Sequence, residues 1–248
     1  MAYQFTNTND IFGQYLSYIR KNYTIFEGSP YPLTINIWLM ITSAPTSLLY
    51  ICGLGNERDP SQHYISINSQ RRCRGTTVDG DGSITTISSP GTNLVATNQW
   101  AMATYVISSS NYRELYLNGI RVGTSTTTRS QTNLSTLAVN GIFAEDVFIW
   151  SPEVAFAAQH EVRYAEFALW QKALSVSEIN SLYKGIKAAI INPQDLVSYI
   201  PMIGGEDIKT IKDLVDGEPI HVSTDGEQID VDIYGSTPTK FSHPRRYG

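Results

Sequence analysis

The chain alternates short apolar segments with turn-forming residues, a pattern typical of β-structure. The segments 33–41 (LTINIWLMI) and 48–54 (LLYICGL) are rich in β-branched and aromatic residues. Apolar runs of this length, bounded by Gly, Pro, Asn or Asp, predict buried strands. Further strands are predicted at 64–69, 99–107, 113–127 with an interruption at 118–119, 134–140 and 162–170.

Two hairpins are predicted from turn chemistry. In residues 72–88, Gly80, Asp81 and Gly82 supply residue types that tolerate the positive φ of a tight turn. Asn118-Gly119, between LYL and IRV, is the strongest short-range hairpin signal in the chain.

One helix is predicted near 175–184. Ser175 and Glu178 form a capping-box pattern, in which each side chain accepts from a free backbone N–H of the first turn. Leu174 and Ile179 match a hydrophobic staple, and Gly185 matches the residue that ends a helix. The apolar face of this helix must pack on a sheet.

The C-terminal residues continue the β pattern. Strands are predicted at 196–202, 219–223 and 229–234. No fixed-period repeat and no low-complexity linker divides the chain, so we predict one domain over 1–248, with 186–248 as an extension packed on the same sandwich.

Composition and charge exclude several classes of protein. With 42% hydrophobic and 17% charged residues, the chain has ample material for a core. A net charge of −5 argues against nucleic-acid binding, and we expect Arg71, Arg72 and Arg74, like Arg245 and Arg246, to be solvated. No secretory signal and no apolar stretch of membrane-spanning length is present. We therefore expect a protein made in a reducing cytoplasm and binding no membrane.

The two cysteines are expected to be free and buried. Symmetric pairing of a hairpin formed by 48–55 and 64–75 places Cys52 opposite Ile67 and not opposite Cys73, so a disulfide is the less favoured alternative.

Four segments in a fixed order carry a family resemblance: LTINIWLM, NQWAMATYV, ELYLNGIRVGTSTT and YAEFALWQKALSVSEINSLYKG. In that order they resemble concanavalin A-like, laminin G-like domains over about residues 30–185. The resemblance implies an all-β, two-sheet antiparallel jelly-roll sandwich with one short capped helix covering an end. We expect Trp38 and Trp100 to fill the space between the sheets. In the strand AEFALW, we expect Ala165, Phe167 and Leu169 to share one face.

The C-terminal segment resembles laminin G-like proteins of bacteriophages and prophages. The matching residues are Leu196 to Met202, Asp213-Leu214-Val215 and His243-Pro244-Arg245, with a departure at Ile200, where an aromatic residue is usual. This resemblance implies a virion protein, synthesised in the host cytoplasm.

No catalytic constellation is visible. Glycoside hydrolases need two nearby carboxylates, whereas Glu161 and Glu166 are an odd number of residues apart and are expected to face opposite sides of a strand. The four histidines, His63, His160, His221 and His243, lack metal-ligand spacing and are expected on the surface. We therefore predict that the chain is not an enzyme, and assign no cofactor.

Calcium is the ion that the family resemblance implies. Asp79 and Asp81 are the best local ligands, although a tight hairpin selects the same residues, and two carboxylates fall short of a calcium shell. For sugar binding, exposed aromatics such as Tyr64 and Tyr112 are candidates, with none singled out.

The segment 141–160 contains more large aromatic residues than the family pattern requires there. They are Phe143, Phe148, Trp150 and Phe156. We expect them to form an interface, with simple core packing as the alternative.

The leading functional hypothesis is a non-enzymatic capsid decoration protein of a phage virion, oligomeric in the particle, which binds the major capsid protein or a tail component and contacts host glycans weakly. The alternative is a lectin-like tail or baseplate adhesin that binds host polysaccharide.

Overall fold

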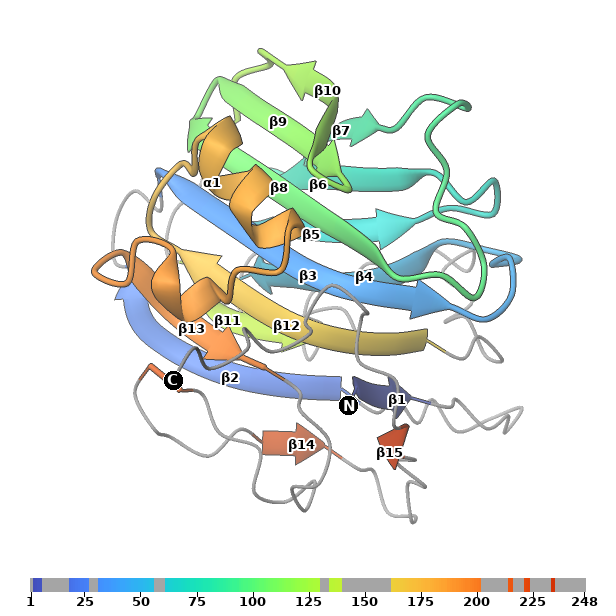
Figure 1. The fold of residues 1–248 in the computed structure, drawn as a ribbon. Helices are drawn as coiled ribbons and strands as arrows, with labels where there is room; N and C mark the ends of the chain where they lie inside the picture. Colours follow the sequence, from blue (N-terminus) through green and yellow to red (C-terminus); the bar gives the residue numbers. More distant parts are fainter. Residues whose placement is uncertain are drawn as a thin grey trace, which may run out of the picture.

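The computed structural model shows two antiparallel β-sheets packed face to face (Figure 1). It describes residues 2–5, 18–26, 31–55, 61–129, 134–139, 162–201, 214–215, 221–223 and 233–234. Sheet A contains β1 (Ala2–Phe5), β3 (Leu33–Ile41), β8 (Ala101–Ser109), β9 (Tyr112–Leu117), β10 (Ile120–Ser125), β12 (Val162–Trp170), β13 (Leu196–Ile200) and β15 (Ile233–Tyr234). Sheet B contains β2 (Tyr18–Phe26), β4 (Leu49–Gly55), β5 (Gln62–Ile67), β6 (Cys73–Val78), β7 (Ile84–Ser88), β11 (Leu134–Val139) and β14 (His221–Ser223).

The order of strands confirms the predicted concanavalin A-like jelly roll. Sheet A runs β10-β9-β8-β3-β12-β1-β15, with β13 also paired to β12, and sheet B runs β14-β2-β11-β4-β5-β6-β7. The sequence pattern did not indicate β1 and β2. In β2, Arg20, Lys21 and Asn22 interrupt the apolar pattern that marks the central strands.

Sheet A is buried on both faces over its central strands. Ile35, Ile37 and Leu39 of β3 belong to the core between the sheets, whereas Trp38 of the same strand belongs to a second apolar cluster. Successive side chains of a strand point to opposite faces, so the second cluster lies on the outer face of sheet A. This double burial explains why apolar residues follow one another without alternation over residues 37–41 of β3.

The predicted helix covers that outer face and not an end of the sandwich (Figure 1). Helix α1 (Val176–Tyr183) begins at Ser175, whose capping box with Glu178 is confirmed, and Gly185 follows it with φ +94°. A short 3-10 helix, η1 (Ala188–Ile190), follows. The expectation for Trp38 and Trp100 was wrong, because both pack in the outer cluster. There the Trp38 ring stacks on Tyr183 at 5.9 Å between centroids.

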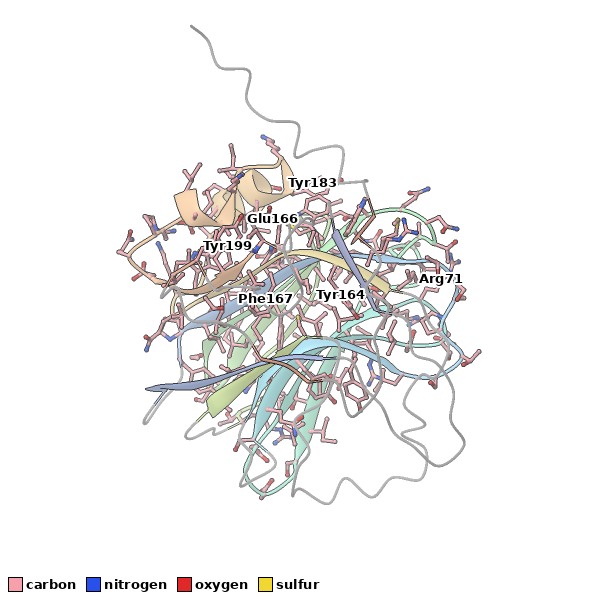
Figure 2. All side chains as sticks on the ribbon, turned by 90° about the horizontal axis from the view of Figure 1, so that it is seen from below. Arg71, Tyr164, Glu166, Phe167, Tyr183 and Tyr199 are labelled. Atoms are coloured by element: carbon pink, nitrogen blue, oxygen red, sulfur yellow. The ribbon has the colours of Figure 1, made fainter. Side chains whose placement is uncertain are left out.

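A bulge in β12 changes the predicted faces of that strand. The register with β3 shifts between Ala165 and Ala168, and Glu166 has φ +53°. Phe167 and Leu169 therefore point into the core, but Ala165 packs in the outer cluster, contrary to expectation. Figure 2 shows Tyr164 and Phe167 between the sheets and Glu166 on the helix side.

A similar irregularity affects the first cysteine. Both thiols are free and buried, as predicted. The expected pairing was wrong, because a register shift between Tyr50 and Cys52 places Cys52 opposite Ile65, and Ile67 pairs with Leu49. Burial raises the pKa of the Cys73 thiol to about 12, so it stays protonated.

Strands of the C-terminal extension add to both sheets. β13 pairs with β12, β15 with β1, and β14 with β2. Among the described residues, no helix combines the length and the apolar composition needed to cross a membrane.

One part of the interior is polar. Arg113 of β9 is fully buried, and its guanidinium donates to Thr77 Oγ1 (3.0 Å) and to the carbonyls of Thr127 (2.7 Å) and Ser110 (2.9 Å). His63 is also fully buried beside Thr77, which corrects the expectation of a surface histidine. Burial lowers the pKa of His63 well below its usual value, so the ring is neutral.

Candidate functional site

The hairpin of β9 and β10 presents a cluster of polar and aromatic side chains on the outer face of sheet A. Along β9 the side chains alternate: Arg113 and Leu115 are buried between the sheets, whereas Tyr112, Glu114 and Tyr116 lie on the other face. The Asn118-Gly119 turn, with φ +53° and +78°, pairs Arg121 of β10 with Tyr116. We call Tyr112, Glu114, Tyr116 and Arg121 the Glu114 cluster.

The Glu114 carboxylate is the centre of this cluster. Its Oε1 accepts from Arg121 Nη1 at 2.8 Å and from the Tyr112 hydroxyl at 3.2 Å. Its Oε2 accepts from the Tyr116 hydroxyl at 3.1 Å. Burial, followed by the neighbouring Glu114 charge, raises the pKa of Tyr116 to about 12. Three donors thus fix the carboxylate in one orientation.

Two members of the Glu114 cluster are accessible to a ligand. Tyr112 is 37% exposed, and the Arg121 side chain is 54% exposed compared with 13% for Glu114. An exposed aromatic face beside charged hydrogen-bonding groups suits a ligand that is apolar on one face and rich in hydroxyls at its edges. No second carboxylate takes part in the hydrogen bonds of this cluster, so the paired-carboxylate geometry of glycoside hydrolysis is absent from it.

Helix α1 borders the Glu114 cluster and fixes the position of its turn. A Cβ on Gly119 would lie 2.8 Å from Asn180 Oδ1 and 3.2 Å from Tyr183 Cβ. The Asn118 side chain also accepts from Met102 N of β8 at 2.9 Å. The cluster is therefore carried by a hairpin held at both its turn and its strands.

The predicted calcium ligands, Asp79 and Asp81, lie in the turn between β6 and β7. Both carboxylates accept from Ser83 N, at 2.9 and 2.7 Å, and Asp79 Oδ2 lies 3.8 Å from Arg129 Nη1. The pKa of Asp81 falls to about 2, chiefly because of its contact with Asp79 and the hydrogen bonds from Ser83. No group of three or more His, Cys, Asp or Glu residues suited to a metal occurs in the described part of the chain. Calcium binding here stays a prediction.

The predicted interface residues, Phe143, Phe148, Trp150 and Phe156, lie outside the described residues, as does Glu161. Their interface role stays a prediction. The structure does place Glu166, which is buried on the helix side of sheet A and accepts a 2.5 Å hydrogen bond from Tyr199 Oη (Figure 2). Burial raises the pKa of Glu166. This pair joins β12 to β13 and has no exposed face, so we assign it a structural role.

Sequence reasoning named Tyr112 but missed Glu114, Tyr116 and Arg121. A signal was available, because a two-residue Asn-Gly turn fixes which residues oppose each other. It pairs Tyr116 with Arg121, and strand alternation then places Glu114 and Tyr112 on the same face.

This architecture is that of a two-sheet lectin-type sandwich, and the family comparison agrees. Residues 17–180 match the model of the Concanavalin A-like lectin/glucanases superfamily, and the chain belongs to this family. No curated protein matches the chain significantly.

Several solved structures share the fold. A pentraxin from Limulus polyphemus, a native heptamer, is 13% identical, with a TM-score of 0.56 over 75% of this chain and 83% of its own. The receptor-binding domain of botulinum neurotoxin D is 16% identical, with a TM-score of 0.55 over 73% of this chain and 43% of its own. Another structure of that toxin's ligand-binding domain, in complex with N-acetylneuraminic acid, is 17% identical, with a TM-score of 0.54 over 73% of this chain. The chain spans under half of that toxin domain, at 41%.

Proposed function

We propose that this chain is a non-enzymatic glycan-binding module, and that the Glu114 cluster is its binding surface. The observation that carries the proposal is the exposed Tyr112 ring beside the fixed Glu114–Arg121 pair. The family supports a lectin role, and one protein of similar fold was solved with a bound sugar acid. Tyr112 would stack on the apolar face of a sugar ring, while Arg121 and Glu114 would bind its hydroxyl groups.

Glycan-array binding of three variants tests this site. Tyr112→Ala removes the ring and should weaken binding about tenfold, a loss of roughly 1.4 kcal/mol, which is within the range of one aromatic contact. Tyr112→Phe keeps the ring and loses only the 3.2 Å hydrogen bond to Glu114, so it should retain most of the affinity. Ile84→Ala, at an exposed position of β7 in the other sheet, is the control. Unchanged binding by Tyr112→Ala would exclude the Glu114 cluster.

Enzymatic activity would contradict the non-enzymatic part of the proposal. Incubation of the purified protein with the glycans that it binds should release no sugar. Release that persists in Tyr112→Ala would locate a catalytic site elsewhere in the chain.

We further propose that the module works on the surface of a bacteriophage particle, as a capsid decoration protein that contacts the major capsid protein. The support is the likeness of residues 196–202, 213–215 and 243–245 to phage proteins of the same family. A tail or baseplate adhesin is the second candidate, favoured by the accessible Tyr112 surface. Quantitative mass spectrometry of purified particles separates the two. Hundreds of copies support decoration, whereas a small multiple of three or six supports the adhesin.

A further inference from the structure

The outer face of sheet B carries a second group of side chains that the proposed site does not use. The register pairs Tyr50 of β4 with Ser66 of β5, and Ser66 with Arg74 of β6, so the three lie side by side on one face. In the next row of the same face, Tyr64 pairs with Thr76. We call Tyr50, Tyr64, Ser66, Arg72 and Arg74 the Arg74 face.

The two tyrosines form an aromatic pair beside the arginine. Their ring centroids are 5.2 Å apart, with an interplanar angle of 54°. Burial, and then the nearby Tyr64, raises the pKa of Tyr50 to about 12. Burial also raises the pKa of Tyr64. Both hydroxyls are therefore neutral at physiological pH, and the rings offer apolar surface and hydrogen bonds without negative charge.

A hydrogen-bonded turn holds Arg71 and Arg72, and Arg74 follows on β6. Asn68 Oδ1 accepts from Gln70 N (3.1 Å) and Arg72 N (2.9 Å), and Arg71, with φ +60°, donates its backbone N–H to Asn68 O (2.8 Å). Arg72 also forms a β-bridge with Leu94. Arg72 and Arg74 are two residues apart on an extended segment and thus share a face. These arginines were expected to be solvated, yet they are half-buried.

Among the residues that the structure describes, no carboxylate neutralises these guanidinium groups. Within the described part of the chain, Arg121 pairs with Glu114 and Arg129 with Asp79, but no acid lies within 4.0 Å of Arg71, Arg72 or Arg74. In addition, the buried atoms Arg74 Nε and Ser66 Oγ have no hydrogen-bond partner. Buried polar atoms in folded proteins are normally paired, so each unpaired one requires an explanation. A bound anion would supply an acceptor for Arg74 Nε, and the unneutralised charges of Arg72 and Arg74 would attract one in a chain of net charge −5.

We propose that the Arg74 face binds the carboxylate of an acidic sugar, with Tyr50 and Tyr64 against the sugar ring. This inference rests on the glycan-binding function proposed above, and it names the ligand class. A carboxylate accepts two parallel hydrogen bonds from one guanidinium, a geometry that a neutral hydroxyl cannot reproduce. The Arg74 face would therefore select uronic or other acidic sugars over neutral ones of the same shape.

The test compares two probes that differ only at one carbon. Sodium glucuronate carries a carboxylate where glucose carries a hydroxymethyl group. In the ¹⁵N-labelled full chain, the Nε–Hε resonances of Arg72 and Arg74 should shift on titration with glucuronate and not with glucose. Sodium acetate, which has a carboxylate and no ring, should bind much more weakly. The shifts should diminish at high salt, because the contact is ionic.

Variants connect these shifts to named residues. Arg74→Gln should weaken glucuronate binding about tenfold, as expected for the loss of one charge-assisted pair. Lys187→Gln, which removes one positive charge from an exposed position after helix α1, is the matched control and should leave this binding unchanged. Circular dichroism checks that both variants fold.

The outcomes separate this inference from the function on which it rests. Absence of a glucuronate shift, or shifts of equal size at Arg129, which pairs with Asp79 outside both proposed sites, would overturn the Arg74 face. Equal binding of acetate would reduce it to an anion site and overturn the sugar assignment. Glucuronate binding that Arg74→Gln leaves intact, together with array binding of glycans that Tyr112→Ala weakens, would keep the proposed function and overturn this inference. No binding to any glycan on the array would overturn the function itself.

Discussion

The Thr77 hydroxyl connects three buried side chains in the polar part of the interior. Thr77 Oγ1 accepts from Arg113 Nε at 3.0 Å and lies 2.8 Å from both His63 Nδ1 and Tyr105 Oη. If Tyr105 donates to Thr77, the hydroxyl of Thr77 must donate to His63 Nδ1. Every proton of these hydroxyls then has an acceptor, and the imidazole proton resides on Nε2. This arrangement exists only while His63 is neutral.

Acid should therefore destabilise the fold through His63. The folded-state pKa of His63 lies well below 6.5 because of burial and, second, the Arg113 charge. Below pH 6.5 the unfolded chain binds a proton that the folded chain does not, so stability is lost as the pH falls. One histidine kept neutral accounts for about 1 kcal/mol between pH 6.5 and 5.5. Urea unfolding at the two pH values measures this loss.

His63→Asn is the matched variant for that prediction, because its side-chain oxygen can still accept from Thr77 and does not titrate. It should lose about 1 kcal/mol less than the wild type between the two pH values. An equal loss in both proteins would show that other groups cause the acid sensitivity.

Individual residues were the least predictable feature of the sequence. Arg113 lies on a predicted strand and His63 immediately precedes the predicted strand 64–69, but polar residues indicate exposure unless their partners are known. Their shared partner Thr77 lies on β6, and the other acceptors of Arg113 are the carbonyls of Ser110 and Thr127, which lie outside the strands. Trp38 was assigned to the wrong face because its strand is buried on both faces. The sequence of such a strand is apolar on each face and does not show which face packs against the second sheet and which against the helix.

At the scale of elements, strands and the helix could be predicted more reliably than their register. The bounds of β3 and β12 match the predicted ranges, and each cap of α1 forms as expected. The bulges at Ile51 and Glu166 were not predictable, because neither residue type marks a bulge and each shift is fixed by pairing with a neighbouring strand. The Glu114 cluster was partly predictable, because the Asn-Gly turn specifies its register.

The contact between the β9–β10 turn and α1 can be tested with two glycines. Gly119 and Gly82 both have positive φ, at +78° and +83°, in hairpin turns. A Cβ on Gly82 meets nothing within 4 Å, so Gly82→Ala measures backbone strain alone, about 1 kcal/mol. Gly119→Ala also forces the turn away from Asn180 and Tyr183, and should cost about 1 kcal/mol more. Chemical denaturation measures both, and equal losses would show that the turn does not depend on the helix.

At the scale of the whole molecule, the C-terminal extension shares both sheets with the first part of the chain. β13 contributes Leu196 and Tyr199 to the outer cluster, and Tyr199 is the hydrogen-bond partner of buried Glu166. A carboxylate left buried without its partner is costly. The pairing of β14 and β15 extends the same dependence to later residues. We keep the prediction of a single domain over 1–248. If it is right, the extension and the first part of the chain should unfold together.

The full chain should unfold in one cooperative transition, with fluorescence and far-ultraviolet circular dichroism coinciding along a urea gradient. Two truncations locate the dependence. Ending the chain after Pro201 keeps β13, whereas ending it after Gly185 removes η1 and β13 and leaves Glu166 buried without Tyr199. We expect the shorter product to be less stable than the longer one by at least 3 kcal/mol, or not to fold, because it loses several buried apolar side chains together with that hydrogen bond. Two separate transitions in the full chain, or equal stability of the two truncated chains, would show that the extension is an independent unit and that the sandwich ends at the capped helix.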